Sequence, residues 1–140
     1  MQKISKTPIT VRYSETDQMG IVHHSRYYPW FEIARADFIK QAGISYKQME
    51  LDGVMLPLTH TGARYIEGLT YDEEVTVTCK LVKLTVVRCT FEYEVIRNSD
   101  LKVVTVGTTS HAFCDNSMKP INLMKKYPKY YELVSELLYE

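Results

Sequence analysis

The chain has 140 residues, the size of a single domain, and is long enough to bury about 70% of the surface that an unfolded chain exposes. Its 17 basic and 17 acidic residues cancel, and no basic block of five or more residues occurs, which argues against nucleic acid or an anionic membrane as a partner. A hydrophobic content of 45% with 24% charged residues excludes a disordered or fibrous chain. We therefore expect one globular domain over residues 1–140.

Neither a secretory leader nor a membrane span is predicted. Residues 1–6 have a cationic start without an apolar run behind it, and no later stretch has the length of a membrane span. Cys79, Cys89 and Cys114 are an odd number without Cys-x-x-Cys spacing, which favours reduced thiols packed in strands over metal ligands or nucleophiles. We expect a cytoplasmic protein.

A short strand and an acidic loop begin the chain. Residues 7–14 alternate apolar and polar side chains, with Tyr13 on the apolar face of a predicted strand. Residues 15–22 break the alternation, and Gly20 has the conformational freedom that a tight turn requires.

The period then becomes helical over residues 24–42, where aromatic and alanine residues recur every three or four positions. Pro29 is tolerated only in the first turn of a helix, so the helix must start just before it. Ser25 is the best N-cap by residue type, and Gly43 is a typical C-terminal stop. The apolar positions of this helix are Tyr27, Phe31, Ala34, Phe38 and Ala42.

The remainder is almost wholly β. A short helix at 45–51, capped by Ser45, precedes the strands, and Gly62 is expected to mark a bulge in the first of them. A final helix is predicted over residues 127–138. Strands in an uninterrupted run indicate an α+β fold with the long helix packed on an antiparallel sheet. The predicted strands span residues 54–67, 74–84, 87–97 and 101–114.

The order of these elements and one local motif resemble a known family, the hotdog-fold acyl-CoA thioesterases of the 4-hydroxybenzoyl-CoA thioesterase type. The resemblance covers nearly the whole chain, but only the first 35 residues carry a specific motif. It implies a hotdog fold, in which an antiparallel sheet wraps one long central helix, plus a C-terminal helix. It also implies homodimers with a continuous sheet and two interfacial sites, often doubled to homotetramers. The motif residues are Asp17, Gly20, Ile21, Val22, His24 and Tyr27, followed by Phe31, Glu32, Ala34 and Arg35.

The resemblance also implies roles for individual residues. Asp17 matches the catalytic carboxylate, which acts as a general base on water or as a nucleophile. His24 falls where the family's helix begins and its backbone N–H polarises the thioester carbonyl, while Tyr13 matches an aromatic residue that lines the site in one branch. Glu32 matches a helix carboxylate that we expect to be structural. The substrate would be an acyl-CoA, with no cofactor beyond the coenzyme A that it carries.

The chain departs from the family pattern after its second predicted strand. Residues 67–69 are Glu-Gly-Leu where many members have a basic residue, proline and alanine. Residues 72–73 are Asp-Glu instead of the usual Gly-Asp. Contacts with the coenzyme A phosphates are therefore not assigned.

The predicted chemistry agrees with what thioester hydrolysis needs, a base or nucleophile for the carbonyl carbon and positive potential at its oxygen. From local chemistry alone, Asp17 is as consistent with a turn-forming or helix-capping residue. Adjacent His23 and His24 cannot face one metal ion as an i, i+4 pair can, so no metal site is predicted. His60 and His111 are expected to be structural strand residues, although His60 could reach a neighbouring pocket.

Two rival functions stay open from the sequence. One is hydration or dehydration of an acyl thioester, which would need a His–Asp or His–Glu acid/base pair. The other is a non-enzymatic acyl-binding module, for which Asp17 would be dispensable.

Overall fold

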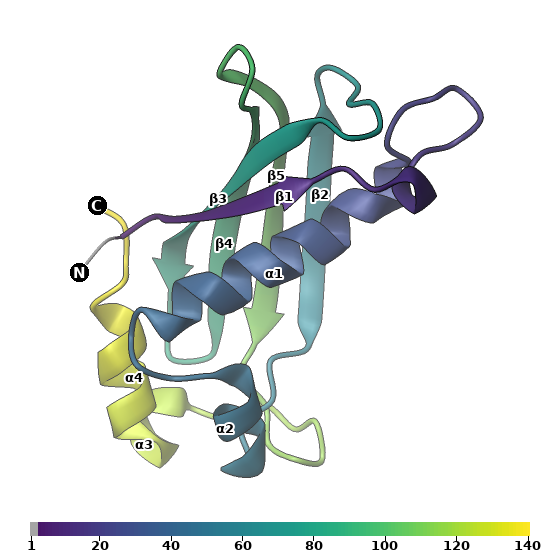
Figure 1. Cartoon of the computed structure of the whole chain (residues 1–140). Coiled ribbons are helices and arrows are strands. Elements are labelled where there is room, and N and C mark those ends of the chain that lie inside the picture. The colour runs from purple at the N-terminus through teal and green to yellow at the C-terminus, as the bar shows by residue number, and fades with distance from the viewer. Residues whose placement is uncertain (1–2) are drawn as a thin grey trace.

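A computed structural model of the chain describes residues 3–140, and it shows one antiparallel sheet with the strand order β1-β3-β4-β5-β2. A long helix, α1, lies diagonally across one face of this sheet, and the short helices α2, α3 and α4 gather at one end (Figure 1). The α+β prediction is confirmed. In chain order the elements are β1 Ser5–Thr10, the 3₁₀ turns η1 Tyr13–Glu15 and η2 His24–Arg26, α1 Tyr27–Lys40, α2 Tyr46–Leu51, β2 Leu58–Tyr65, β3 Glu74–Leu84, β4 Arg88–Arg97, β5 Lys102–Ala112, α3 Leu123–Lys126 and α4 Pro128–Ser135.

The core lies between α1 and the sheet. Alternate residues of β3 and β4 face α1 and are fully buried, while the residues between them are partly or fully exposed, as the period of two predicts. Phe31 of α1 stacks on Tyr93 of β4 with ring centroids 4.5 Å apart, and Phe38 meets Phe91 edge to face at 6.0 Å. Because aromatic side chains bury large apolar areas, these pairs hold α1 firmly on the sheet.

Buried polar side chains of β1 also tie the sheet to α1. The Ser5 hydroxyl donates to the carbonyl of Ala34 at 3.2 Å, and the Thr7 hydroxyl donates to Asp37 at 2.7 Å. Such bonds offset the cost of burying hydroxyl groups at this edge of the core.

The first strand is shorter than the prediction for residues 7–14. It ends at Thr10, because the Arg12 N–H donates to the Glu15 carboxylate at 2.8 Å and the chain turns into η1. Tyr13, expected on the apolar strand face, therefore lies in η1 with 74% of its surface exposed.

The start of the long helix was also predicted differently. Pro29 does lie in the first turn of α1, and Gly43 ends the helical segment with φ +79° and an N–H bond to the Lys40 carbonyl, as expected. Ser25, however, is not the cap. The N-cap of η2 is His23, whose ring accepts the N–H of Ser25. Residue-type preferences for hydroxyl and carboxamide caps give no sign that an imidazole takes this place.

Three further predictions needed adjustment. The strand predicted over 54–67 is β2, Leu58–Tyr65, and its register shift lies between Leu58 and His60 instead of at Gly62. Cys79 and Cys89 are buried strand residues as predicted, but Cys114 is buried two residues beyond β5. The short helix α3 was not predicted, because four residues do not establish a period.

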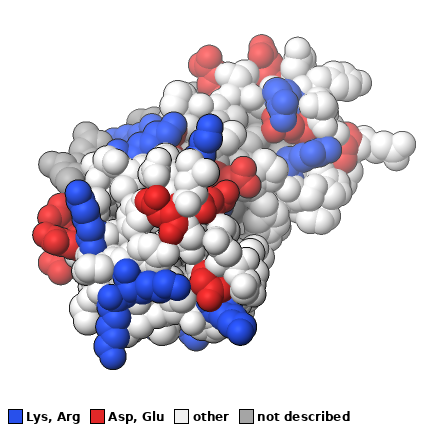
Figure 2. Space-filling view, turned by 90° about the horizontal axis from the view of Figure 1, so that it is seen from below, with Lys and Arg blue, Asp and Glu red and all other residues white. Residues whose placement is uncertain are grey.

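The surface carries no dominant charge on the face that Figure 2 shows. Basic and acidic side chains are interspersed there, over the end of the molecule where the short helices gather. No helix within residues 3–140 combines the length and apolar character needed to cross a bilayer.

Candidate active site

A pocket of about 300 Å³ lies beside the start of α1, between the loop that follows η1 and the segment that follows β2. We call it the helix-start pocket. It brings together Asp17 and His24, two of the three predicted site residues. Its lining residues are Asp17, Met19, Ile21, Val22, His24, Tyr27, Tyr65, Ile66, Glu67 and Gly68.

The loop that carries Asp17 is closed on itself by backbone hydrogen bonds. The Asp17 N–H donates to the Ile21 carbonyl and the Gly20 N–H donates to the Asp17 carbonyl, both at 2.9 Å. Gly20 has φ +81°, a conformation that L side chains rarely adopt, which explains glycine at this turn. A β-bridge between Thr16 and Val22 completes the closure. The position of Asp17 is therefore set by the loop backbone.

The Asp17 carboxylate has one occupied and one available oxygen. Its Oδ1 accepts the N–H of Met19 at 2.8 Å. Its Oδ2 has no hydrogen-bond or ion-pair partner within residues 3–140. One oxygen thus orients the group, and the other can accept a proton or attack a carbon.

Glu15 anchors the same loop from below. Only 3% of this residue is exposed, and its carboxylate accepts the indole N–H of Trp30 at 2.7 Å and the N–H of Arg12 at 2.8 Å. Its backbone carbonyl accepts the N–H of His23 at 2.8 Å. Because Trp30 belongs to α1 and Arg12 follows β1, Glu15 fixes the loop to both elements at once.

The backbone N–H groups at the helix start differ in one important respect. The N–H of His23 donates to Glu15, that of Ser25 to the His23 ring, and that of Arg26 to the His23 carbonyl. Within residues 3–140, the N–H of His24 alone in this run has no acceptor. An N–H group without an intrahelical partner at a helix start carries the positive end of the helix dipole. It is a suitable donor to a developing oxyanion.

The opposite wall comes from the end of β2 and the segment after it. The Tyr65 hydroxyl donates to the His24 carbonyl at 3.3 Å, and partial burial raises the pKa of Tyr65 to about 12, so the hydroxyl keeps its proton. The Val22 N–H donates to the Leu69 carbonyl at 2.9 Å. A Cβ atom at Gly68 would stand 2.9 Å from the Ile21 side chain, so this close approach favours glycine.

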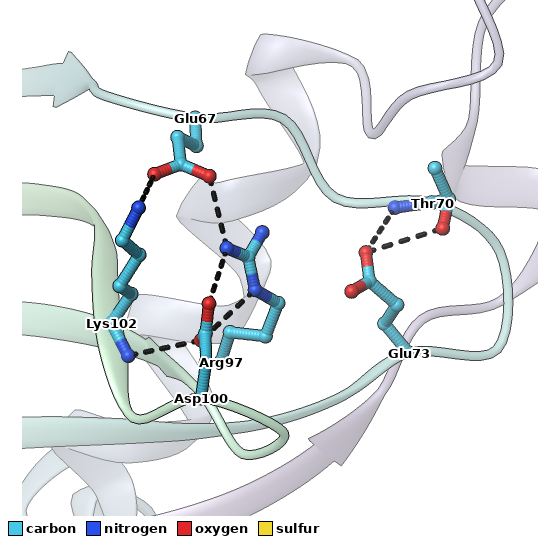
Figure 3. A network of polar contacts seen from close by, with 6 residues as sticks. All are labelled: Glu67, Thr70, Glu73, Arg97, Asp100 and Lys102. Atoms are coloured by element: carbon cyan, nitrogen blue, oxygen red, sulfur yellow. Dashed lines mark hydrogen bonds and ion pairs between the residues drawn. The ribbon is translucent and has the colours of Figure 1, made fainter.

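An ion-pair network holds this wall in place (Figure 3). Glu67, which lines the pocket, accepts hydrogen bonds from Arg97 at 2.9 Å and from Lys102 at 3.0 Å. Arg97 also pairs with Asp100 at 2.8 Å, so the β4–β5 turn and the segment after β2 are fastened together. The two hydrogen bonds and the two charges lower the pKa of Glu67, which stays ionised at neutral pH.

Comparison with known proteins identifies the family. Residues 11–128 match the Thioesterase-like superfamily. The chain belongs to this superfamily. It is 36% identical over 129 residues to YneP of Bacillus subtilis, whose name assigns it to the acyl-CoA thioesterases, with 91% of this chain and 93% of the relative covered. The acyl-CoA thioesterase YbgC of Haemophilus influenzae is 25% identical over 121 residues, with 85% and 88% covered.

Comparison with a solved structure supports the same family. The crystal structure of DHNA-CoA thioesterase from Staphylococcus aureus superposes with a TM-score of 0.90 at 34% identity, covering 96% of this chain and 90% of the other. The predicted resemblance to hotdog-fold acyl-CoA thioesterases, the hotdog fold itself and the prediction of a thioesterase are thereby confirmed.

In this thioesterase Tyr13 lies apart from the other two predicted site residues. It does not line the helix-start pocket, and its ring packs on that of Tyr71 with centroids 5.7 Å apart. Glu32 is exposed on α1 and is likewise outside the pocket lining. His60 is exposed on β2 and does not reach this pocket. Within residues 3–140 no group of three potential metal ligands comes together.

A second polar cluster of the thioesterase lies between α1 and the sheet, and we call Arg35, Tyr93, Thr109 and His111 the interior polar network. Arg35 is half-buried, and the other three residues are buried. Arg35 donates to the Tyr93 hydroxyl at 3.1 Å, which lies 2.6 Å from the Thr109 hydroxyl. His111 contacts the Thr109 hydroxyl at 3.0 Å and the Leu56 carbonyl at 3.2 Å, so it is a bonded structural histidine as predicted. Burial and the nearby Arg35 charge lower the pKa of His111 to about 4.

Sequence reasoning missed three residues around the pocket. Glu15 looked like one more acid of a polar loop, and its contact with Trp30 spans 15 positions. Tyr65 reaches His24 from 41 positions away. The capping role of His23 was not predicted, and the only available signal was its place just before the helix.

Proposed function

We propose that this thioesterase hydrolyses acyl-CoA thioesters to a free acid and coenzyme A through Asp17 and the backbone N–H of His24. One observation carries the assignment of roles. A carboxylate with an available oxygen and a helix-start N–H without an acceptor belong to residues of the same pocket. Membership of the thioesterase-like superfamily supports the reaction type.

Asp17 has two routes to the thioester. As a general base it takes a proton from water while that water attacks the carbonyl carbon, and it returns the proton to the departing thiolate. As a nucleophile it attacks the carbonyl carbon, the C–S bond breaks and the coenzyme A thiolate leaves, which gives a mixed anhydride of Asp17 and the acyl group; water then cleaves this anhydride to the free acid and restores the carboxylate. In both routes the carbonyl oxygen becomes an oxyanion, and the His24 N–H donates to it. Loss of one such donor costs about 3–4 kcal/mol of transition-state stabilisation.

The side chains beside these groups would orient the substrate. The His24 ring approaches Tyr65 edge-on at 6.4 Å, and Tyr27 packs against Tyr65 at 5.4 Å, so the pocket wall is aromatic. We propose that the acyl carbonyl lies between this wall and Asp17. The role of Tyr13 in orienting the substrate remains a prediction. Its exposed position favours a contact with the part of the substrate that lies outside the pocket.

We also propose a homodimer, which could pair into a homotetramer. β2 is the last strand of the sheet, and its outer edge has no neighbouring strand within residues 3–140. Open edges are usually paired or covered, and Leu58 and Tyr65 on this strand and Ile66 just after it are about half exposed. A second copy added at β2 would continue the sheet and cover these side chains. Sedimentation equilibrium of the wild type and of Leu58→Glu tests this; a wild type that stays monomeric at high concentration would contradict it.

A cytoplasmic location is part of the same proposal. All three cysteines are buried free thiols, and burial raises the pKa of Cys89 to about 12 and that of Cys79 further. Protonated, buried thiols are the state that a reducing compartment maintains.

Thiol release from aliphatic and aromatic acyl-CoAs tests the proposal, with wild type, Asp17→Asn and the matched control Asp72→Asn. Asp72 is an exposed carboxylate outside the pocket, and its φ of 71° also suits asparagine. We expect release by wild type and Asp72→Asn and its loss in Asp17→Asn. Full activity of Asp17→Asn would remove the mechanism, and no release from any substrate would favour an acyl-binding module.

The alternative function, hydration or dehydration of an acyl thioester, requires a separate assay. His24 and Asp17 line one pocket, so both residue types that such an acid/base pair needs are present there. Loss of water from a 3-hydroxyacyl-CoA without thiol release would decide for this rival. Thiol release without water loss is the result that we expect.

A further inference from the structure

The cap at the start of the long helix is an imidazole ring. Nδ1 of His23 accepts the backbone N–H of Ser25 at 3.2 Å and lies 2.8 Å from the Ser25 hydroxyl. Caps of this kind are usually hydroxyl, carboxylate or carboxamide oxygens. Because a backbone N–H can only donate, Nδ1 must hold a lone pair, and the neutral ring carries its proton on Nε2.

This cap determines which N–H groups remain available. The N–H of His23 is taken by the Glu15 carbonyl and that of Ser25 by the His23 ring, so the N–H of His24 between them is the one left for a ligand. The His23 ring also stacks on the His24 ring, with centroids 4.1 Å apart and a tilt of 32°. Removing the ring would free the Ser25 N–H and loosen the turn that holds His24.

We propose that His23 is a positioning residue, whose neutral imidazole fixes the turn that presents the His24 N–H to the thioester oxygen. This inference rests on the proposed function of that N–H. It assigns His23 a role that is separate from contact with substrate, because His23 does not line the pocket.

The role has a consequence that an ordinary capping residue would not have. A protonated Nδ1 is a donor that faces the Ser25 N–H, so the cap requires a ring without a proton on Nδ1. The charge would also lie against the His24 ring. We therefore expect activity to fall on the acid side. Other titratable or charged side chains lie around this turn. Glu15, Asp17 and Arg26 belong to the same segment, and the Glu15 carboxylate is turned to Trp30. Tyr65 belongs to β2.

The test compares wild type with His23→Ala and His23→Asn, measuring kcat and KM for acyl-CoA hydrolysis from pH 5 to pH 9. Asparagine is a good N-cap that does not titrate, so it separates capping from protonation. At pH 8 we expect His23→Ala to lower kcat about tenfold with little change in KM, less than the roughly 10²–10³ lost with an oxyanion donor. His23→Asn should stay within about threefold of the wild type.

The decisive readout is the shape of the acid limb. Wild-type kcat should decline toward acid pH, and this decline should be smaller in His23→Asn, which keeps His24 and Asp17. An unchanged acid limb in His23→Asn, or full activity of His23→Ala, would overturn the proposal. Urea unfolding checks that each variant is folded; if His23→Ala is not, the comparison of wild type with His23→Asn decides alone. A wild type without thioesterase activity at every pH would instead refute the proposed function.

Discussion

The helix-start pocket and the interior polar network both lie along α1, but they differ in how their polar groups are satisfied. In the pocket, Oδ2 of Asp17 and the N–H of His24 have no partner within residues 3–140. In the network, half-buried Arg35 and buried His111 are linked through two hydroxyl groups. Polar groups left available at an accessible place can bind and react, whereas buried ones contribute stability only while they are bonded.

Glu15 is a buried, hydrogen-bonded carboxylate that also anchors the loop of the helix-start pocket. We expect its removal to have the largest effect on the free energy of unfolding. Glu15→Ala leaves the Trp30 indole N–H and the Arg12 N–H without an acceptor, at about 1–3 kcal/mol for each unsatisfied group. Urea unfolding should show a loss of roughly 4 kcal/mol, and thiol release should fall as well because the Asp17 loop loses its anchor. The control Glu15→Gln keeps one acceptor oxygen and should lose less than half as much. An unchanged free energy of unfolding in Glu15→Ala would contradict the anchoring role of Glu15.

His111 should make the network sensitive to acid. Its folded pKa of about 4 lies below the value of about 6.5 for an unfolded histidine. Its contribution to the free energy of unfolding is therefore present above pH 6.5 and is lost as the pH falls toward 4. This difference corresponds to roughly 3 kcal/mol. Urea unfolding from pH 8 to pH 4 should therefore show a smaller loss on the acid side in His111→Asn than in wild type. Parallel pH profiles for the two proteins would contradict the assignment.

Tyr93 tests whether the interior polar network stabilises the fold without taking part in catalysis. Tyr93→Phe keeps the ring stacked on Phe31 but removes the hydroxyl that joins Arg35 to Thr109. We expect a loss of about 2 kcal/mol in the free energy of unfolding, with kcat within about twofold of the wild type. A large fall in kcat with unchanged stability would show that the network takes part in catalysis.

Tyr13 should show the smallest effect. Its ring is largely exposed on Tyr71, so Tyr13→Ala should change the free energy of unfolding by less than about 0.5 kcal/mol. Any effect on hydrolysis should appear in KM, because the residue lies outside the pocket that holds the reacting groups. A drop in kcat comparable to that of Asp17→Asn would return Tyr13 to the catalytic centre.

Local patterns predicted the parts of the fold and site that depend on local chemistry. The strand over 74–84 matches β3 at both ends, and the turn restrictions of Pro29 and Gly43 placed the long helix to within a few residues. The resemblance carried by the motif around Asp17 and His24, and not local chemistry alone, predicted two residues that do share a pocket.

The contacts that complete the site could not be predicted in this way. The bond from Trp30 to Glu15 and the contact of Tyr65 with His24 join elements that meet only after the sheet has packed on α1. The His23 cap depends on the rotamer and tautomer of one ring, which no periodicity encodes. The end of β1 depends on a carboxylate that turns back to Arg12.

The most direct test of the division between chemistry and stability is a paired measurement on Asp17→Asn. Asparagine keeps the Oδ1 that accepts the Met19 N–H, so the loop should be retained while the base or nucleophile is lost. We predict that thiol release falls by at least about 10²-fold, with the free energy of unfolding within about 0.5 kcal/mol of the wild type. Retained thiol release in a folded Asp17→Asn protein would contradict the account.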